Sequence, residues 1–273
     1  MPDFQNYLLN LGLATTTVTS YLGDLRVFSQ WFFQTNGVQL APAVLTMTDL
    51  REYRAWLVTV QRAAPATINR HLAAIRAYAK CNGQPLDIKG VTEQQQAPKW
   101  LDRREASALL REMERKVLAA KTVYGKANAT WDRAVIVLLL NTGLRISELC
   151  NLQQADIKLS ERSGSITVQA GKGMKNRTIP LNKNAREVLQ SIHIPITIKA
   201  RTIQRMVEEA GRRANVEVTP HRLRHTFAKS LIDAGRPLTE VAALLGHSSL
   251  DTTRLYTIPG QQDLAKAVAA LDD

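Results

Sequence analysis

Five short stretches in the second half of the chain set cationic and titratable side chains between apolar segments. Arg145 and Glu148 have the i, i+3 spacing of a helical ion pair. His221 and His225 have the i, i+4 spacing with which one helix can present two nitrogens to a metal ion. The residues between these histidines lack the glutamate of a zinc-protease helix, and no further ligand set is evident, so we expect no metal site. In chain order, the groups are Arg145, Glu148, Lys172, His221, Arg224, His225, His247 and Tyr256.

Short helices and one hairpin are expected to position these groups. Asp102 and Glu105 have the spacing of a capping box that opens the first helix of this region. The Gly-Lys-Gly sequence around Lys172 predicts the loop of a β-hairpin, and the helix that carries the two histidines is expected to follow Thr219 and Pro220. The expected helices and strands before that point are helices over 131–140 and 146–152, and strands over 165–168 and 177–181.

The first third of the chain is expected to form a separate helical unit. Apolar residues recur there at three- and four-residue steps, as on one face of a helix. Residues 85–99 are polar and have no such period, so they are the best candidate for a linker between domains 1–84 and 100–273. Four basic residues around the expected helix over 64–81 either face solvent or contact phosphates. They are Arg62, Arg70, Arg76 and Lys80.

Composition limits the class of protein and of partner. A chain of 273 residues with 45% hydrophobic residues is long enough for two domains with real cores. Its longest apolar run, over 134–140, is too short to cross a membrane, and no secretory signal is visible. The formal net charge of +12 favours a polyanionic partner such as nucleic acid. Cys81 and Cys150 do not suggest a disulfide framework, so a reducing cytoplasm is expected.

Taken together and in this order, the groups resemble the tyrosine recombinase family, also called the phage-integrase family. The resemblance covers most of the chain and is strongest from residue 142 to residue 257. A tyrosine nine residues after the histidine of the last block completes the pattern. The matching blocks are TGLRISEL at 142–149, GKGMKNR at 171–177, TPHRLRHTFA at 219–228 and LGHSS at 245–249.

The resemblance implies strand cleavage without a metal or cofactor. Tyr256 would attack a DNA phosphodiester, giving a 3′-phosphotyrosyl link and a free 5′-hydroxyl. Arg145 and Arg224 would clamp the nonbridging oxygens, on which negative charge gathers in the transition state. His221 would assist the loss of the tyrosine proton, as a base or as a hydrogen-bond partner.

The remaining matching residues would support that reaction. Lys172 would protonate the leaving 5′-hydroxyl, and His247 would donate a further hydrogen bond to the phosphate. Glu148 would keep the arginine side chains oriented without itself contacting the phosphate. His225 fits the same neighbourhood, although a packing role is equally consistent with its position. The hairpin also adds two candidate DNA contacts, Lys175 and Arg177.

The family comparison also implies a fold and an assembly. We expect a mainly helical protein with a small β-hairpin or sheet in the catalytic domain, forming a two-domain, C-shaped clamp on double-stranded DNA that carries a specific recombination site. Four protomers would gather on two duplexes and exchange a C-terminal helix. Helical sequence that begins near Asp3 leaves no room for an arm-binding domain, which favours a Xer-like enzyme of the cytoplasm, associated with the nucleoid. The apolar stripe expected on the exchanged helix is Leu264, Ala267, Val268 and Leu271.

Three alternatives remain at this point. A type IB topoisomerase-like enzyme would share the chemistry but relax supercoils as a monomer. A DNA-binding protein that has lost catalysis would be indifferent to the loss of Tyr256. A metal hydrolase would use His221 and His225 and would be sensitive to chelators. The segment between residues 189 and 202 is also short for the family, which leaves details of the DNA-facing surface open.

Overall fold

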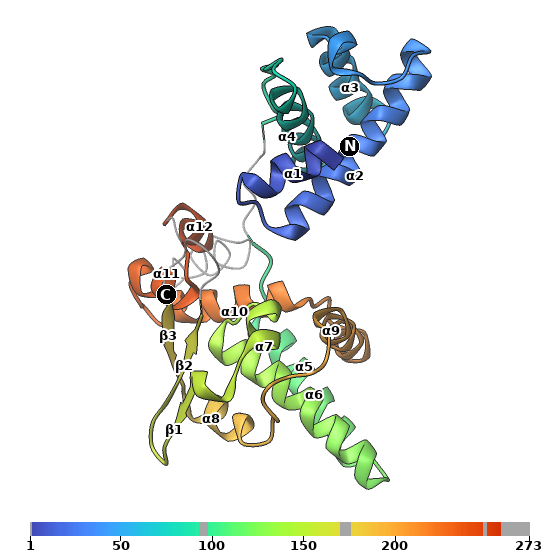
Figure 1. Ribbon diagram of the computed structural model, residues 1–273. Coiled ribbons are helices and arrows are strands. Elements are labelled where there is room, and N and C mark those ends of the chain that lie inside the picture. The colour runs from blue at the N-terminus through green and yellow to red at the C-terminus, as the bar shows by residue number, and fades with distance from the viewer. Residues whose placement is uncertain (1, 93–97, 170–175, 248–249, 258–273) are drawn as a thin grey trace, which may run out of the picture. The chain divides into compact units, whose positions relative to one another are not determined.

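The computed structural model describes residues 2–92, 98–169, 176–247 and 250–257. The chain divides into two compact units, residues 1–94 and 95–273. Figure 1 shows that both units are built mainly from helices and that the second also holds a small sheet. Cys81 and Cys150 are both free thiols.

Unit 1 is a helical bundle around an aromatic core. The ring of Tyr53 lies 4.8 Å from that of Phe28 and 5.0 Å from that of Trp31, measured between centroids. The side chains of Thr46 and Asp49 form a reciprocal capping box at the start of the helix over residues 47–59. The helical elements of unit 1 are α1 (Pro2–Asn10), α2 (Thr15–Asn36), the short 3-10 helix η1 (Pro42–Val44), α3 (Met47–Thr59) and α4 (Pro65–Cys81).

A polar network lies inside this aromatic core. Asp24 accepts two hydrogen bonds from Arg70, of 2.7 and 2.9 Å, and lies 3.2 Å from Nε2 of His71. Nδ1 of His71 is in turn 2.9 Å from the hydroxyl of Tyr53. An ionised carboxylate only accepts hydrogen bonds, so His71 donates through Nε2 and accepts from Tyr53 at Nδ1. Arg70, a candidate DNA contact by sequence, thus directs two of its nitrogens to Asp24.

The segment expected to be a linker differs from that expectation over residues 86–91. Ile88 is 4% exposed and packs into the core of unit 1. Asn69 bonds both backbone groups of Val91, at 2.8 and 3.0 Å, and Arg54 donates to the carbonyl of Lys89. Side chains of α3 and α4 therefore hold this polar stretch in place, through contacts that hydrophobic periodicity does not report.

Unit 2 is organised around the central helix α6. Six consecutive residues of this helix, 134–139, are buried, which shows that this part of the helix is covered on all sides. It packs against α5, α8 and α10. The elements of unit 2 are α5 (Arg103–Ala119), α6 (Val123–Thr142), α7 (Ile146–Asn151), η2 (Gln154–Asp156), β1 (Ile157–Leu159), β2 (Gly164–Val168), β3 (Arg177–Pro180), α8 (Lys183–Leu189), α9 (Ala200–Ala214), α10 (Pro220–Asp233), α11 (Leu238–Leu245), α12 (Asp251–Arg254) and η3 (Leu255–Thr257).

The expected hairpin is present in a three-stranded antiparallel sheet of order β1-β2-β3. Ile166 of β2 faces Ile179 of β3, and both side chains are buried. Strand β1 was not predicted, because three residues are too few to show an alternating pattern. The capping box of Asp102 and Glu105 at the start of α5 is confirmed, with hydrogen bonds of 2.7 and 2.9 Å.

Substitution of Tyr53 by Phe tests the buried network of unit 1. The change removes only the hydroxyl and leaves Nδ1 of His71 without its donor, so we expect the free energy of unfolding to fall by about 1–2 kcal/mol. Urea unfolding followed by circular dichroism and tryptophan fluorescence measures this. Tyr21→Phe is the control, because the Tyr21 hydroxyl has no hydrogen bond within the described part of the chain. Equal stability of the two variants would contradict a stabilising role for the network.

Candidate functional site

The turn between α6 and α7 places Arg145. Helix α6 ends at Gly143, whose φ of 62° is left-handed. A Cβ there would lie 2.4 Å from the ring of Phe227, so both the backbone angle and the space require glycine. Arg145 then returns to an extended conformation as the N-cap of α7, and its backbone N–H donates to Glu148 at 2.8 Å. The sequence Thr-Gly-Leu-Arg is therefore a helix-to-helix corner that projects one arginine.

Glu148 is the centre of a group of guanidinium ions. Its carboxylate accepts from Arg145 Nη1 at 2.8 Å and from two nitrogens of Arg177 at 2.7 and 2.9 Å. Arg224 Nη1 lies 3.9 Å away. Burial alone would raise the pKa of Glu148, but the hydrogen bonds from Arg177 and Arg145 outweigh it and lower the pKa to about 2. The site therefore carries one fixed negative charge among three positive ones.

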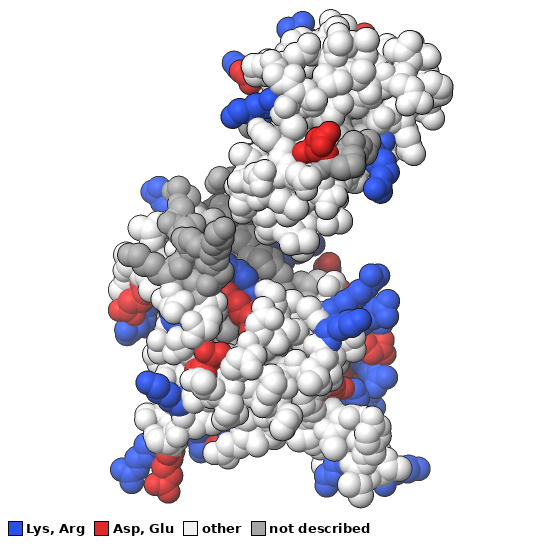
Figure 2. All heavy atoms as spheres, viewed as in Figure 1, with Lys and Arg blue, Asp and Glu red and all other residues white. Residues whose placement is uncertain are grey.

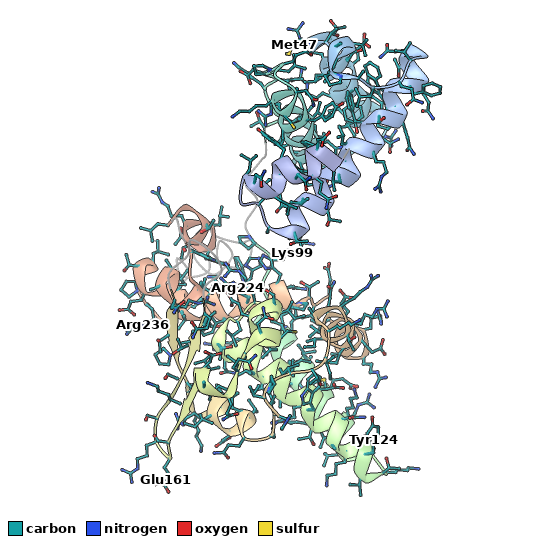
Figure 3. All side chains as sticks on the ribbon, viewed as in Figure 1. Met47, Lys99, Tyr124, Glu161, Arg224 and Arg236 are labelled. Atoms are coloured by element: carbon teal, nitrogen blue, oxygen red, sulfur yellow. The ribbon has the colours of Figure 1, made fainter. Side chains whose placement is uncertain are left out.

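Arg224 is held by backbone carbonyls. It lies on α10 (labelled in Figure 3) and is only 2% exposed. Its terminal nitrogens donate to the carbonyls of Gly143 and Leu245, each at 2.6 Å. Burial, followed by the nearby charge of Arg145, lowers its pKa to about 10, which leaves it a cation at neutral pH. Helix α10 thereby joins the corner after α6 to the end of α11.

Tyr256 lies on the short helix η3 and is 3% exposed. Its hydroxyl is 2.7 Å from Nδ1 of His225, and the His225 ring packs edge-on against that of His221 with centroids 4.2 Å apart. Burial raises the pKa of Tyr256, an effect opposed by Arg224 and Arg145. The family resemblance predicts His221 beside the tyrosine proton, whereas in this structure His225 makes that contact.

The histidines of the site are neutral at physiological pH. Burial, followed by the neighbouring His221 and Arg224, lowers the pKa of His225 to about 4. Burial and Arg224 lower the pKa of His247 to about 4. Desolvation by the surrounding side chains, with Arg224 and Arg145, also lowers the pKa of His221, although part of its surface stays exposed. Neutral imidazole has one donor and one acceptor nitrogen, so each ring can take part in hydrogen bonding in both directions.

A glycine turn places His247 directly after α11. Gly246 ends that helix with a φ of 67°. Nδ1 of His247 then lies 2.8 Å from the hydroxyl of Thr253, which is fully buried. This bond joins the end of α11 to α12, the helix that precedes Tyr256. No feature of the sequence pointed to Thr253, because a single threonine in a polar run has no distinguishing spacing.

The predicted site residues fall into four groups. Contacts link Arg145, Glu148 and Arg224, and a second chain of contacts links His221, His225 and Tyr256, with Arg224 and Arg145 influencing the pKa of the tyrosine. Lys172 and Lys175 lie outside the described residues, as does the apolar stripe after residue 258. The candidates in unit 1 are described apart from this site. They are Arg62, Arg70, Arg76 and Lys80.

The hairpin motif predicts that Arg177 contacts DNA, but its side chain is only 12% exposed. Its three donating nitrogens have partners within the protein: two bond Glu148, and Nε donates to the carbonyl of Leu244 at 2.8 Å. A DNA phosphate would have to compete with these partners. A basic residue in a hairpin motif does not reveal by sequence alone whether it faces solvent or a buried carboxylate.

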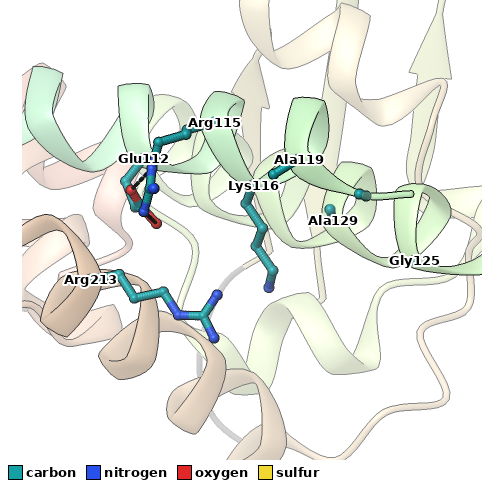
Figure 4. A pocket seen from close by; sticks show the side chains of 8 residues that line it. Glu112, Arg115, Lys116, Ala119, Gly125, Ala129 and Arg213 are labelled. Carbon is teal, nitrogen blue, oxygen red and sulfur yellow. Dashed lines mark hydrogen bonds and ion pairs between the residues drawn. The ribbon is translucent and has the colours of Figure 1, made fainter. Parts of the chain in front are cut away.

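Other charged regions of unit 2 lie on different elements. Figure 2 shows Lys and Arg side chains gathered beside α9 on the face in view, and this helix carries Arg201, Arg205, Arg212 and Arg213. A hollow between α5, α6 and α9 (Figure 4) is lined by none of the candidate site residues. Its basic groups are neutralised locally by ion pairs. The pairs are Arg115–Glu112, Lys116–Asp132 and Arg213–Glu209.

The described residues contain no group of three or more His, Cys, Asp or Glu side chains arranged to hold a metal ion. His221 and His225 thus lack a third protein ligand within the part of the chain that the structure describes. In the same part of the chain, no helix is long and apolar enough to span a membrane.

Comparisons with known proteins give a family. Residues 99–194 and 195–262 match the phage integrase family, and residues 1–85 match the phage integrase N-terminal SAM-like domain. Tyrosine recombinase XerA of Thermococcus kodakarensis is 29% identical over 282 residues, covering 97% of this chain and 92% of the relative. XerA of Thermococcus onnurineus is 32% identical over 218 residues, covering 74% and 73%.

Solved structures agree on the fold. The XerH site-specific recombinase in a pre-cleavage complex with its difH substrate has a TM-score of 0.70 at 21% identity, covering 92% of this chain and 78% of that one. A lambda integrase (75–356) dimer bound to a COC′ core site has a TM-score of 0.67 at 16% identity, covering 93% and 92%. The two family matches together span nearly the whole sequence. The chain belongs to the phage integrase family and is a tyrosine-type site-specific DNA recombinase.

Proposed function

We propose that Tyr256 is the nucleophile with which this recombinase breaks and rejoins DNA. The observation that carries the proposal is the position of its hydroxyl, 2.7 Å from a neutral histidine and within the electrostatic influence of Arg145 and Arg224. The phenolic oxygen would bond to phosphorus as the bond to the 5′-oxygen breaks. One phosphodiester replaces another, so the energy of the bond is kept for rejoining by a 5′-hydroxyl.

Arg145 and Arg224 would stabilise the charge that develops on the nonbridging oxygens. Arg145 is 39% exposed at its side chain and bonds Glu148 through Nη1. Its other guanidinium nitrogens make no hydrogen bond to any described residue, so they are available to a phosphate. Arg224 is almost fully covered in the present structure and would have to be uncovered as DNA enters. Glu148 would keep both side chains oriented.

The histidines would manage the tyrosine proton. With a pKa of about 4, His225 is neutral near pH 7 and can accept that proton or a hydrogen bond from it. Tyr256 at 3% exposure cannot touch a phosphodiester, so the bond to His225 belongs to a resting arrangement that opens before attack. His221, which packs against His225 and is itself exposed, would assist the tyrosine once it faces DNA.

Two further groups would complete the reaction. Nδ1 of His247 would accept from the hydroxyl of Thr253, so the proton on Nε2 would be donated to the phosphate. Lys172 would protonate the leaving 5′-oxygen, a role supported by the resemblance of its Gly-Lys-Gly motif to that of the family. In this scheme, side chains of this protein take part in each bond change at phosphorus and in each proton transfer.

The division of the chain and its assembly are also part of the proposal. Residues 1–84 would form the helical core-binding domain and residues 100–273 the catalytic domain, in line with the two family matches. Two duplexes that carry the specific recombination site would be held by a homotetramer that exchanges its C-terminal segment. The apolar stripe in the sequence of residues 264–271 supports this exchange, because a terminal amphipathic segment requires a groove in which to bury that stripe. Such an enzyme would act in the cytoplasm, on the nucleoid.

The Tyr256→Phe substitution should abolish the covalent protein–DNA adduct while leaving DNA binding unchanged, because only the nucleophilic oxygen is lost. The adduct is measured by incubating protein with a nicked cognate site in chelator, denaturing the mixture and separating it by gel electrophoresis. The control is Tyr124→Phe, at a tyrosine that is 77% exposed on α6. An adduct formed by the Tyr256 variant would refute the assignment of the nucleophile.

Arg145→Ala and Arg224→Ala should each slow cleavage by about 10²- to 10³-fold, the usual cost of one donor to a transition-state oxyanion. DNA affinity should change little, since many other basic residues share the attraction to phosphates. Single-turnover cleavage and gel-shift titration measure the two quantities separately. Arg162→Ala, at an exposed position between β1 and β2, is the matched control. Cleavage at the normal rate by either variant would remove that arginine from the site.

Truncation after Pro259 should impair the pairing of two duplexes more than the binding of one protomer to one site. The reason is that truncation would remove the apolar stripe from the protomer interface and would leave the DNA-binding surface intact. Native gels with one and with two labelled duplexes distinguish these species. Recombination at the full rate by the truncated protein would rule out exchange of the terminal segment.

A further inference from the structure

The guanidinium of Arg177 joins three elements at the back of the candidate site. Arg177 is the first residue of β3, and its Nη1 and Nη2 reach the two oxygens of Glu148 on α7 at 2.9 and 2.7 Å. Its Nε donates to the carbonyl of Leu244 on α11 at 2.8 Å. A planar fork of donors satisfies this geometry, and the single ammonium of lysine does not.

The contact with Glu148 determines what holds Arg145. Glu148 Oε1 accepts from Arg145 and Arg177 side chains together, and Oε2 accepts from the Arg145 backbone and from Arg177. Each carboxylate oxygen is therefore shared by the two arginines. Without Arg177, the buried carboxylate would keep only its bonds to Arg145 and a distant contact with Arg224 at 3.9 Å.

The contact with α11 determines the path of the chain into His247. Carbonyls at the end of a helix lack partners within the helix and attract cations. Arg177 bonds the carbonyl of Leu244, and Arg224 bonds that of Leu245, the next residue. Gly246 follows with its left-handed backbone, and a Cβ there would lie 2.9 Å from Cδ and Nη1 of Arg177. The side chain of Arg177 thus lies directly against the turn that presents His247.

We infer that Arg177 is a positioning residue of the recombination reaction, which acts by holding Glu148 and the end of α11 and not by binding DNA. This inference rests on the proposed roles of Arg145, Arg224 and His247. The expectation that Arg177 contacts DNA is replaced by a role for its guanidinium in contacts within the protein. The hairpin motif would then contain one residue that fixes the positions of Arg145 and Arg224 without itself contacting the phosphate.

The central test compares Arg177→Met with Arg177→Lys. Methionine fills similar space without a charge, and lysine restores the charge without the fork. We expect Arg177→Met to slow single-turnover cleavage of a nicked cognate site by about 10- to 100-fold, less than the loss of an arginine that contacts the phosphate. Arg177→Lys should recover only part of that rate, because one ammonium cannot bond both oxygens of Glu148 and the Leu244 carbonyl.

DNA affinity separates positioning from contact. The dissociation constant of Arg177→Met, measured by gel shift at several salt concentrations, should stay within about 3-fold of the wild type with an unchanged salt dependence. A loss of affinity as large as the loss of rate, with a shallower salt dependence, would overturn the inference in favour of a DNA contact.

A pH profile separates positioning from general loss of structure. Among the described residues, the charged groups that face Glu148 are Arg145 at the α6–α7 corner, Arg177 of β3 and Arg224 of α10. Loss of Arg177 removes the strongest hydrogen bonds that hold the pKa of Glu148 near 2. We expect the acidic limb of the cleavage rate to move to higher pH in Arg177→Met. An unmoved limb would contradict action through Glu148.

Two more variants complete the design. In a Glu148→Gln background, Arg177→Met should slow cleavage far less than in the wild type, and equal effects in both backgrounds would overturn the inference. Arg186→Met is the matched control, because Arg186 also donates to a backbone carbonyl, that of Leu181, but belongs to α8. An equal loss of cleavage rate in Arg186→Met would show that Arg177 has only a structural role.

The proposed function is tested in parallel by Tyr256→Phe. An adduct that persists in that variant refutes the assignment of Tyr256. A Tyr256→Phe protein without adduct, beside an Arg177→Met protein that cleaves at the wild-type rate, refutes only the inference about Arg177.

Discussion

One partly buried carboxylate, that of Glu148, organises the candidate site of this recombinase. Glu148 accepts hydrogen bonds from two arginines and lies within 3.9 Å of a third, so a single negative charge offsets part of the repulsion among three cations. Guanidinium groups gathered without such an anion would repel one another, because arginine keeps its charge at neutral pH. The low pKa of Glu148 follows from the same arrangement. A net positive charge remains at the place where, on the proposed mechanism, the phosphate would bind.

The arrangement depends on helix ends as much as on side chains. Both α6 and α11 end in a glycine with left-handed backbone, Gly143 and Gly246, which frees carbonyls from helical hydrogen bonding. Arg224 takes two of those carbonyls, and Arg177 takes a third. Because rigid backbone groups hold these arginines, their positions follow from the packing of α10 and β3 onto α6 and α11. The same two corners direct Arg145 and His247 toward the site.

Tyr256 is held in a different way from the cations. Its ring joins a small cluster with Ala228, Val241 and Leu245, and its hydroxyl bonds His225. A phenol that is buried and has a raised pKa is poorly reactive. The structure therefore combines an ordered set of arginines with a tyrosine that is sheltered from solvent. On the proposed mechanism, the entry of DNA would supply the energy to expose that tyrosine.

The sequence by itself determined the helical character of both units, the hairpin, the capping box at Asp102 and the family, because these depend on local periodicity, on turn residues and on motifs read in order. It also singled out Glu148 and Tyr256 as candidates for the site. Only the tertiary structure decided that residues 86–91 pack on unit 1, that His225 and not His221 bonds the tyrosine, and that Arg177 faces Glu148. Those outcomes depend on contacts between residues far apart in the chain, such as the 31 positions that separate His225 from Tyr256. Such contacts are set by the packing of whole elements, and no local pattern of residue types encodes them.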